Sequence, residues 1–359
     1  MSERGMPMQI RRLWSGIPSR GLIPILTVFS FGVYLPLPAT AAAQGTCQRI
    51  LVQDSTLNNL IDPAGYRTGE LGTLAEVRQT GMGPQSMILI PGLGFGAEIF
   101  DDFMARHASE FRMYAVTLPG FGGSAAPPSP AESVSFGDQI WTNGALSAIE
   151  SLIEREGIQN PILVGHWMTG TQLALRLAMK HPENTRAVVI LSGSARFVPT
   201  DTTRMPFQMP LDKRVAGVDR YMAPLWFKTV TRETWDDNNF LPSDYAVNPI
   251  LGLRLWRWAA EPELHVWVRY LCEFYAQDIS LELDQVTVPT LILKPGLEGN
   301  FFDPGQNYML GFCHQSWERG SALGPRMEMQ TVPNTRACMW FDQPEDVDRR
   351  MGDFLKTLN

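Results

Sequence analysis

Short aliphatic runs alternate with amphipathic stretches along most of this chain. The aliphatic and β-branched runs predict strands buried in a sheet: Leu74–Thr80, Ser86–Ile90, Met113–Leu118, Ile162–Val164, Ala187–Leu191, Val288–Leu293 and Met327–Val332. Apolar residues at helical spacing predict helices at Ala97–Phe111, Gln139–Glu156, Thr171–Ala178 and Pro344–Leu358. Such alternation is typical of an α/β fold with a mostly parallel sheet.

The stretch Pro161–Ala178 places a strand, a turn bracketed by Gly165 and Gly170, and a helix in immediate succession. This is the setting of the nucleophile elbow, the G-x-S-x-G type of motif. The positions around its centre must be small because strand and helix approach closely, and Thr169 and the two glycines satisfy that. The central residue is Trp167. An indole has no group that attacks an acyl carbon, so the motif lacks its nucleophile.

The loop Pro91–Gly96 is rich in glycine and lies between a predicted strand and a predicted helix. Such a loop can cradle a phosphate. It contains neither the dinucleotide pattern G-x-G-x-x-G nor a P-loop lysine, so we do not expect a phosphate site there.

The segment Phe197–Asp284 interrupts the alternation of strands and helices. It has no clear strand pattern and is rich in large side chains, namely Phe207, Trp226, Phe227, Trp235, Phe240, Trp256, Trp258, Trp267, Phe274 and Tyr275. We expect most of these side chains to form the core of the segment itself and a few to line an apolar cavity. Lys294–Gly324 is expected to be irregular.

Taken in order, several segments resemble the α/β-hydrolase superfamily. They are MILIPGLGFG, AVTLPGFGGS, ILVGHWMTG, AVVILSGS, PTLILKPGLEG and PNTRACMWFDQPEDVDRRMGDFL, and they are spread in the family's order over roughly Leu74–Leu358. The resemblance implies an α/β-hydrolase fold: a mostly parallel sheet flanked by helices, with a helical cap inserted at about 197–284. It implies ester or amide hydrolysis for active members, and fold alone does not name a substrate.

The resemblance also implies a nucleophile, a histidine base and an orienting acid. The nucleophile position is Trp167. The histidine position lies seven residues before Pro344 and is Ala337, which cannot move a proton. The acid position, eight residues after the threonine of PTLIL, is Glu298, with Asp303 as the alternative.

Two backbone N–H groups, of Leu93 and Met168, occupy the oxyanion positions that the family uses. Backbone donors do not depend on side-chain identity, so this part of the site can survive the substitutions. By the same resemblance, His166 is a structural residue under the end of the sheet, and the pocket or elbow positions are Gly92, Gly165, His166, Thr169 and Gly170.

Other residues are weaker substitutes for the lost groups. His314 lies in the long segment after Glu298 and could fold back over the site, whereas His181 is expected to end a helix. Cys338 follows the histidine position, but no neighbouring residue is expected to lower its pKa. No H-x-x-x-H or C-x-x-C spacing is present, so neither a metal site nor a cofactor is expected.

The first forty residues predict export. Four arginines precede an apolar run, Leu22–Pro38, and a small-residue site at Ala41–Ala43, as in a secretory signal peptide. A membrane anchor is the alternative, but the run is short and contains three prolines. We therefore expect residues 1–43 to be removed, and 44–359 to form a secreted or periplasmic domain with no stable membrane span.

Composition excludes some partners. The chain has 359 residues, 44% of them apolar and 19% charged, with a net charge of −7. Removing residues 1–43, which carry +3, leaves about −10. An acidic chain without a basic cluster is unsuited to nucleic acid. Cys47, Cys272, Cys313 and Cys338 allow one or two disulfides, with three full pairings, or can stay unpaired and buried.

Two hypotheses for function follow. In the first, the protein is a pseudohydrolase with a degraded triad that binds a small, partly apolar molecule under its cap. In the alternative, it is a functional hydrolase of ester or amide bonds with a non-standard catalytic set that involves Glu298, His314 or Cys338. The oligomeric state does not follow from the sequence.

Overall fold

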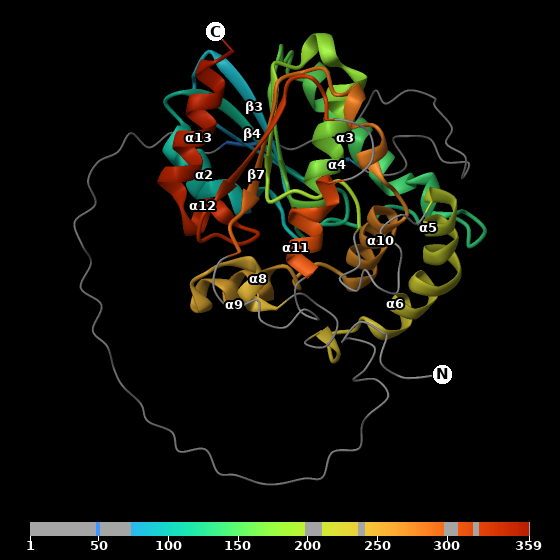
Figure 1. Ribbon diagram of the computed structural model, residues 1–359. Helices are drawn as coiled ribbons and strands as arrows, with labels where there is room; N and C mark the ends of the chain where they lie inside the picture. The colour runs from blue at the N-terminus through green and yellow to red at the C-terminus, as the bar shows by residue number, and fades with distance from the viewer. Residues whose placement is uncertain are drawn as a thin grey trace, which may run out of the picture.

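The computed structural model describes residues 48–50, 73–197, 210–235, 241–297, 308–318 and 323–358. An eight-stranded sheet crosses the molecule in the order β1-β2-β4-β3-β5-β6-β7-β8, and helices cover both of its faces (Figure 1). The strands are β1 Gln48–Ile50, β2 Glu76–Thr80, β3 Gln85–Ile90, β4 Phe111–Thr117, β5 Ile162–His166, β6 Ala187–Leu191, β7 Thr290–Pro295 and β8 Met327–Val332. The six strands β4, β3, β5, β6, β7 and β8 pair in parallel, whereas β1 pairs antiparallel with β2 and β2 pairs antiparallel with β4. The expected α/β-hydrolase fold with a mostly parallel sheet is confirmed.

The central strands are apolar on both faces because helices cover both faces. In β5, Val164 pairs in register with Leu89 of β3 and Val189 of β6, and all three side chains are fully buried. A strand that is buried on both sides reads as a continuous apolar run rather than an alternating one. The sequence therefore revealed these strands clearly.

Helices lie in two groups on either side of the sheet (Figure 1). One group holds α2 Asp101–His107, α12 Met339–Asp342 and α13 Pro344–Lys356, and the other holds α3 Ile140–Arg155 and α4 Trp167–Lys180. On α13, Val347, Met351 and Phe354 form the buried face at helical spacing. Short 3-10 turns occur at η2 Ala97–Phe100, η3 Phe136–Asp138 and η4 Pro182–Asn184.

The cap lies between β6 and β7 in the chain and gathers at the carboxyl end of the parallel strands (Figure 1). Its elements are α5 Leu211–Gly217, the π-helical turn η5 Val218–Met222, α6 Ala223–Thr229, α8 Pro242–Tyr245, α9 Pro249–Trp258, α10 Leu264–Tyr275, η6 Ile279–Leu281 and η7 Leu283–Gln285. Several of its aromatic side chains pack on one another, as expected: Trp235 meets Trp267 at 5.2 Å and Trp226 meets Tyr275 at 4.9 Å between ring centroids. Phe207 and Phe240 lie outside the described residues.

The structure corrects three boundaries. The helix expected to reach Phe111 ends at His107, because Phe111 already pairs with Gln85 as the first residue of β4. The strand expected at Val288–Leu293 runs from Thr290 to Pro295. The segment expected to be irregular contains α11 Tyr308–Cys313 and η8 Gln315–Trp317, which are too short for a helical period to show in the sequence.

Three cysteines, Cys272, Cys313 and Cys338, are unpaired and buried. A two-disulfide framework is therefore wrong, and the unpaired alternative applies to these three. The predicted signal peptide, Cys47 and the acid candidates Glu298 and Asp303 lie outside the described residues. Within the part of the chain that is described, no helix combines the length and apolar character needed to span a bilayer.

Candidate active site

The elbow is sharper than the sequence indicated. The strand β5 ends at His166 and α4 begins at Trp167, so no residue separates them, whereas the sequence predicted a six-residue turn before Thr171. Trp167 has φ 51°, in the left-handed region that bulky residues rarely adopt. A Cβ placed on Gly165 would lie 2.5 Å from the Gly170 oxygen, so this close approach requires glycine.

The Trp167 side chain fills the space above the elbow. Only 1% of the residue is exposed, and its ring meets Tyr245 of the cap edge-on, with centroids 5.3 Å apart. The Thr171 hydroxyl donates to the Trp167 carbonyl, and the Thr169 hydroxyl donates to Pro91 O at 3.1 Å. The Trp167 side chain is therefore packed between the elbow and the cap.

His166 ties together three segments that are far apart in the sequence. Its Nδ1 accepts from the Gly92 N–H at 3.1 Å, so its Nε2 carries the proton and donates to Ala337 O at 3.1 Å. Complete burial lowers the pKa of His166 to about 3, which keeps the ring neutral. Because both ring nitrogens are hydrogen-bonded to backbone groups, His166 holds the Gly92 and Ala337 segments together and has no free nitrogen to act as a general base.

Ala337, where the sequence placed the histidine position, is hydrogen-bonded to the cap through its backbone. Ala337 is fully buried, and its N–H donates to Asp244 O at 3.0 Å. The next N–H, of Cys338, donates to Tyr245 O at 3.0 Å. Burial also raises the pKa of the Cys338 thiol well above its usual range, so this group stays protonated.

The loop that carries the first oxyanion position is held between elbow and cap. A Cβ on Gly92 would lie 2.9 Å from both His166 Nδ1 and Trp167 Cβ, and one on Gly94 would lie 2.8 Å from Ala259 O. The two residues whose N–H groups would serve as donors, Leu93 and Met168, are buried at 1% and 0% exposure. Both residues therefore lie in the buried core around the elbow.

The possible replacements for the base do not join the elbow residues described above. His314 is half-buried after α11, with Nε2 2.7 Å from Pro295 O at the end of β7. His181 ends α4, as expected, and its Nε2 lies 2.7 Å from Glu150 Oε1. A 14-residue helix separates it from Trp167, a rise of about 20 Å. In the described ranges, no group of three His, Cys, Asp or Glu residues is arranged to hold a metal ion.

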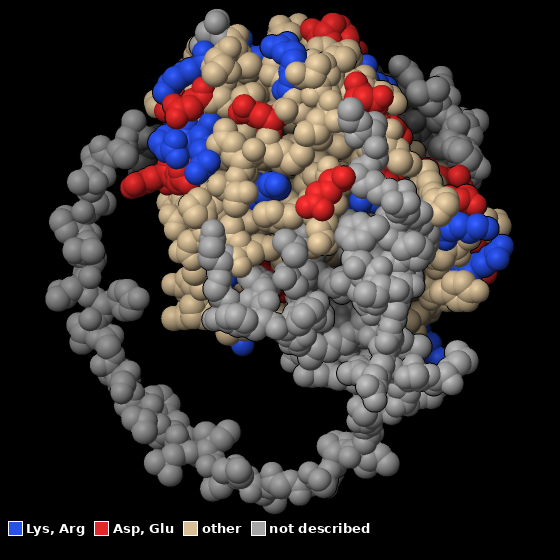
Figure 2. All heavy atoms as spheres, in the orientation of Figure 1, with Lys and Arg blue, Asp and Glu red and all other residues tan. Residues whose placement is uncertain are grey.

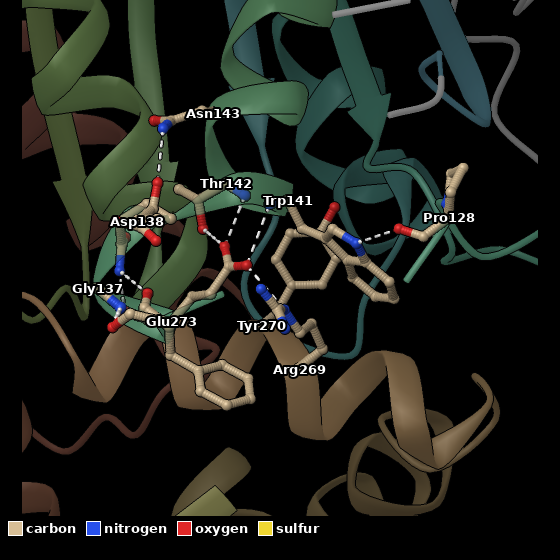
Figure 3. Close-up of polar contacts among 12 residues, drawn as sticks. Pro128, Gly137, Asp138, Trp141, Thr142, Asn143, Arg269, Tyr270 and Glu273 are labelled. Carbon is tan, nitrogen blue, oxygen red and sulfur yellow. Dashed lines mark hydrogen bonds and ion pairs between the residues drawn. The ribbon is translucent and has the colours of Figure 1, made fainter. Parts of the chain in front are cut away.

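A buried carboxylate that the sequence did not reveal joins the cap to the main domain. Glu273 of α10 is fully buried and accepts from the Trp141 N–H at 3.1 Å, the Thr142 N–H at 2.8 Å and the Thr142 hydroxyl at 2.7 Å (Figure 3). Arg269, one turn earlier, donates to it at 2.9 Å. Glu273 thus caps α3, whose own N-cap residue Gln139 makes no side-chain capping bond.

Two open hollows on the surface of the described residues lie away from the elbow. One is on the cap, along α5 and η5, and the other lies between the start of α3 and the end of α4. Neither is lined by Trp167 or Ala337. Acidic and basic side chains are interspersed on the visible face of the molecule rather than separated by sign (Figure 2).

The sequence profile described as the alpha/beta hydrolase family matches residues 87–350. The chain belongs to the alpha/beta hydrolase family. The eight-stranded order, the left-handed elbow and the cap between β6 and β7 accord with this membership.

Among curated members, several relatives are esterases. The pimeloyl-[acyl-carrier protein] methyl ester esterase of Yersinia enterocolitica is 28% identical over 121 residues, which are 34% of this chain and 41% of that enzyme. The enzyme of the same name from Aeromonas hydrophila is 27% identical over 218 residues, 60% of this chain and 77% of that enzyme. The chain thus spans less than half the length of some of these relatives.

Among solved structures, the esterase EaEST from Exiguobacterium antarcticum superposes with a TM-score of 0.55 at 16% identity. The match covers 78% of this chain and 96% of that one. At this level of identity the likeness is one of fold.

His166 should make stability depend on pH. Its pKa is about 3 when folded, against about 6.5 for an unfolded histidine, so the unfolded state binds more protons between these values. Stability is then greatest above pH 6.5 and falls as pH falls toward 3. Urea unfolding at a series of pH values should show a slope up to about 1.4 kcal/mol per pH unit steeper for the unmodified protein than for His166→Gln. His265→Gln, at an exposed histidine, should leave the slope unchanged; equal slopes in all three proteins would contradict the assignment.

Proposed function

We propose that this protein is an exported alpha/beta hydrolase family member that does not hydrolyse esters through its elbow, and that it binds a small, partly apolar molecule under the cap. The observation that supports the first part most strongly is the packing of Trp167 against Tyr245. Ala337, at the histidine position, uses its backbone to join His166 and the cap. Removing one member of a nucleophile and base pair abolishes nearly the whole contribution of the pair, and here both are replaced.

The binding part of the proposal is supported by two indole N–H groups in the cap. Trp235 and Trp267 are 4% and 2% exposed, and among the described residues their Nε1 atoms have no acceptor. A buried donor without a partner is costly, so such groups are often satisfied by a ligand or by ordered water. Trp267 Nε1 also lies against Gly94, next to the backbone of the oxyanion positions.

The alternative, a working hydrolase with a non-standard set, is supported by the esterase relatives. Cys338 is unsuited to such a set because its thiol stays protonated. His314, whose Nε2 lies 2.7 Å from Pro295 O at the end of β7, is the imidazole that this alternative would use.

One preparation tests the proposal. Protein recovered from outside the cytoplasm is treated with a fluorophosphonate probe and measured by intact mass, before and after denaturation. We expect a mature start near Gln44, no covalent adduct, and a small molecule lost on denaturation. A probe adduct, or turnover of p-nitrophenyl acetate by the unmodified protein, would favour the alternative. An intact start at Met1 in a membrane fraction would refute export.

A further inference from the structure

A polar hollow lies beside the second half of α4, the helix that begins at the elbow. It is a hollow of about 470 Å³, open to solvent, between the start of α3, the end of α4 and the turns η6 and η7. Seven polar residues line it: Asp138, Gln139, Asn143, Arg176, Lys180, Glu282 and Gln285. None of them belongs to the elbow or to the oxyanion loop.

Arg176 is the centre of this hollow. The guanidinium is partly buried and reaches only two amide oxygens, Gln139 Oε1 at 3.3 Å and Asn143 Oδ1 at 3.4 Å. Both distances are long for hydrogen bonds. No described carboxylate forms an ion pair with it, and burial lowers its pKa, partly offset by Glu282 and Glu273. A partly buried cation with such weak partners can gain from an anionic one.

The two amides are oriented by bonds on their other side. Gln139 Nε2 donates to Phe136 O at 3.0 Å and to Glu273 O at 2.5 Å. Asn143 Nδ2 donates to Asp138 O at 3.1 Å (Figure 3). Since these bonds use the NH₂ groups, the amide oxygens are turned toward the guanidinium. The planar fork of Arg176 is thereby positioned in advance for a planar, bidentate acceptor.

The remaining charges around the hollow select among anions. Lys180 forms an ion pair with Glu150, with 2.7 Å between Nζ and Oε1, so its charge is already partly neutralised. Asp138 and Glu282 are exposed carboxylates at the rim. They repel a multiply charged anion such as phosphate and attract a hydrogen-bond donor or a positive group.

We propose that the hollow beside Arg176 binds a small carboxylic acid that also carries an ammonium or hydroxyl group. The carboxylate lies on the guanidinium fork, and the donor end faces Glu282 and Asp138. Because the site is separate from the elbow, the proposal does not depend on whether the protein hydrolyses esters.

Matched ligands test this proposal on the full protein. Calorimetric titration at fixed ionic strength compares 4-aminobutyrate, butyrate and inorganic phosphate, which isolates the ammonium group and the anion type. We expect 4-aminobutyrate to bind at least threefold more tightly than butyrate, and phosphate to bind more weakly than either. No detectable binding of 4-aminobutyrate at 20 mM, or binding of phosphate at least as tight, would overturn the proposal.

Variants assign the binding to these residues. Arg176→Gln should weaken 4-aminobutyrate binding at least tenfold, and Arg176→Lys, which keeps the charge but loses the fork, should weaken it less. Glu282→Gln should remove most of the preference over butyrate. Arg155→Gln, at an exposed arginine that pairs with Glu156 at the opposite end of α3, should bind as the unmodified protein does. Equal affinities for the unmodified protein and both Arg176 variants, with circular dichroism showing that they are folded, would refute the assignment.

Discussion

Trp167→Ser is expected to lower the free energy of unfolding by about 3–5 kcal/mol, as for other large truncations in a protein core. The indole is 1% exposed and packs edge-on against Tyr245, so its removal leaves a cavity between the elbow and the cap. Relief of the left-handed backbone does not offset this loss, because serine at φ 51° is also in an unfavourable region. Urea unfolding measures the change.

The same variant should not hydrolyse p-nitrophenyl acetate. The new hydroxyl would lack a base, since Ala337 has no titratable group and both nitrogens of His166 are bound to backbone. Adding Ala337→His should produce measurable turnover. The indole that is removed packs against Tyr245, and the N–H groups of residues 337 and 338 donate to Asp244 O and Tyr245 O. A histidine at position 337 would therefore lie near the vacated space.

Trp317→Ser provides the matched control, since Trp317 is also a buried tryptophan, bound through Nε1 to Gly193 O at 3.1 Å. It should lose comparable stability and gain no activity when Ala337→His is added. Measurable hydrolysis by the unmodified protein that Trp167→Ser leaves unchanged would show that the chemistry lies elsewhere.

Glu273→Gln should be similarly destabilising, by about 3–5 kcal/mol. The carboxylate is fully buried and accepts from two N–H groups of α3, the Thr142 hydroxyl and Arg269. Glutamine keeps one acceptor, but its NH₂ group faces donors, and the Arg269 charge loses its counter-ion in a buried place. Urea unfolding followed by tryptophan fluorescence measures the loss.

Two comparisons separate this network from ordinary surface charge. Glu150→Gln removes a partly exposed carboxylate that pairs with Lys180 and His181, and should cost at most about 1 kcal/mol. Arg269→Met should cost less than Glu273→Gln, because Glu273 keeps the three donors of α3. If Glu273→Gln cost no more than Glu150→Gln, the buried carboxylate would not be what fastens the cap to α3.

The sequence by itself determined the fold, the position of the cap and the place of Trp167 at the elbow. Central strands such as Ala187–Leu191 appear as continuous apolar runs because both faces are covered. The glycines around the elbow appear because only glycine fits there, as Gly165 against Gly170 O demonstrates. The apolar runs and the elbow glycines are local signals, because each depends only on residues that are close together in the sequence.

Only the tertiary structure decided what fills the site. The contact of Trp167 with Tyr245, the bonds from His166 to Gly92 and Ala337, and the capping of α3 by Glu273 each join residues separated by more than 70 positions. A single sequence contains no periodic signal for such pairs, because each depends on where the cap settles on the sheet. That placement, rather than the motif, decides that the elbow of this protein is closed by an indole.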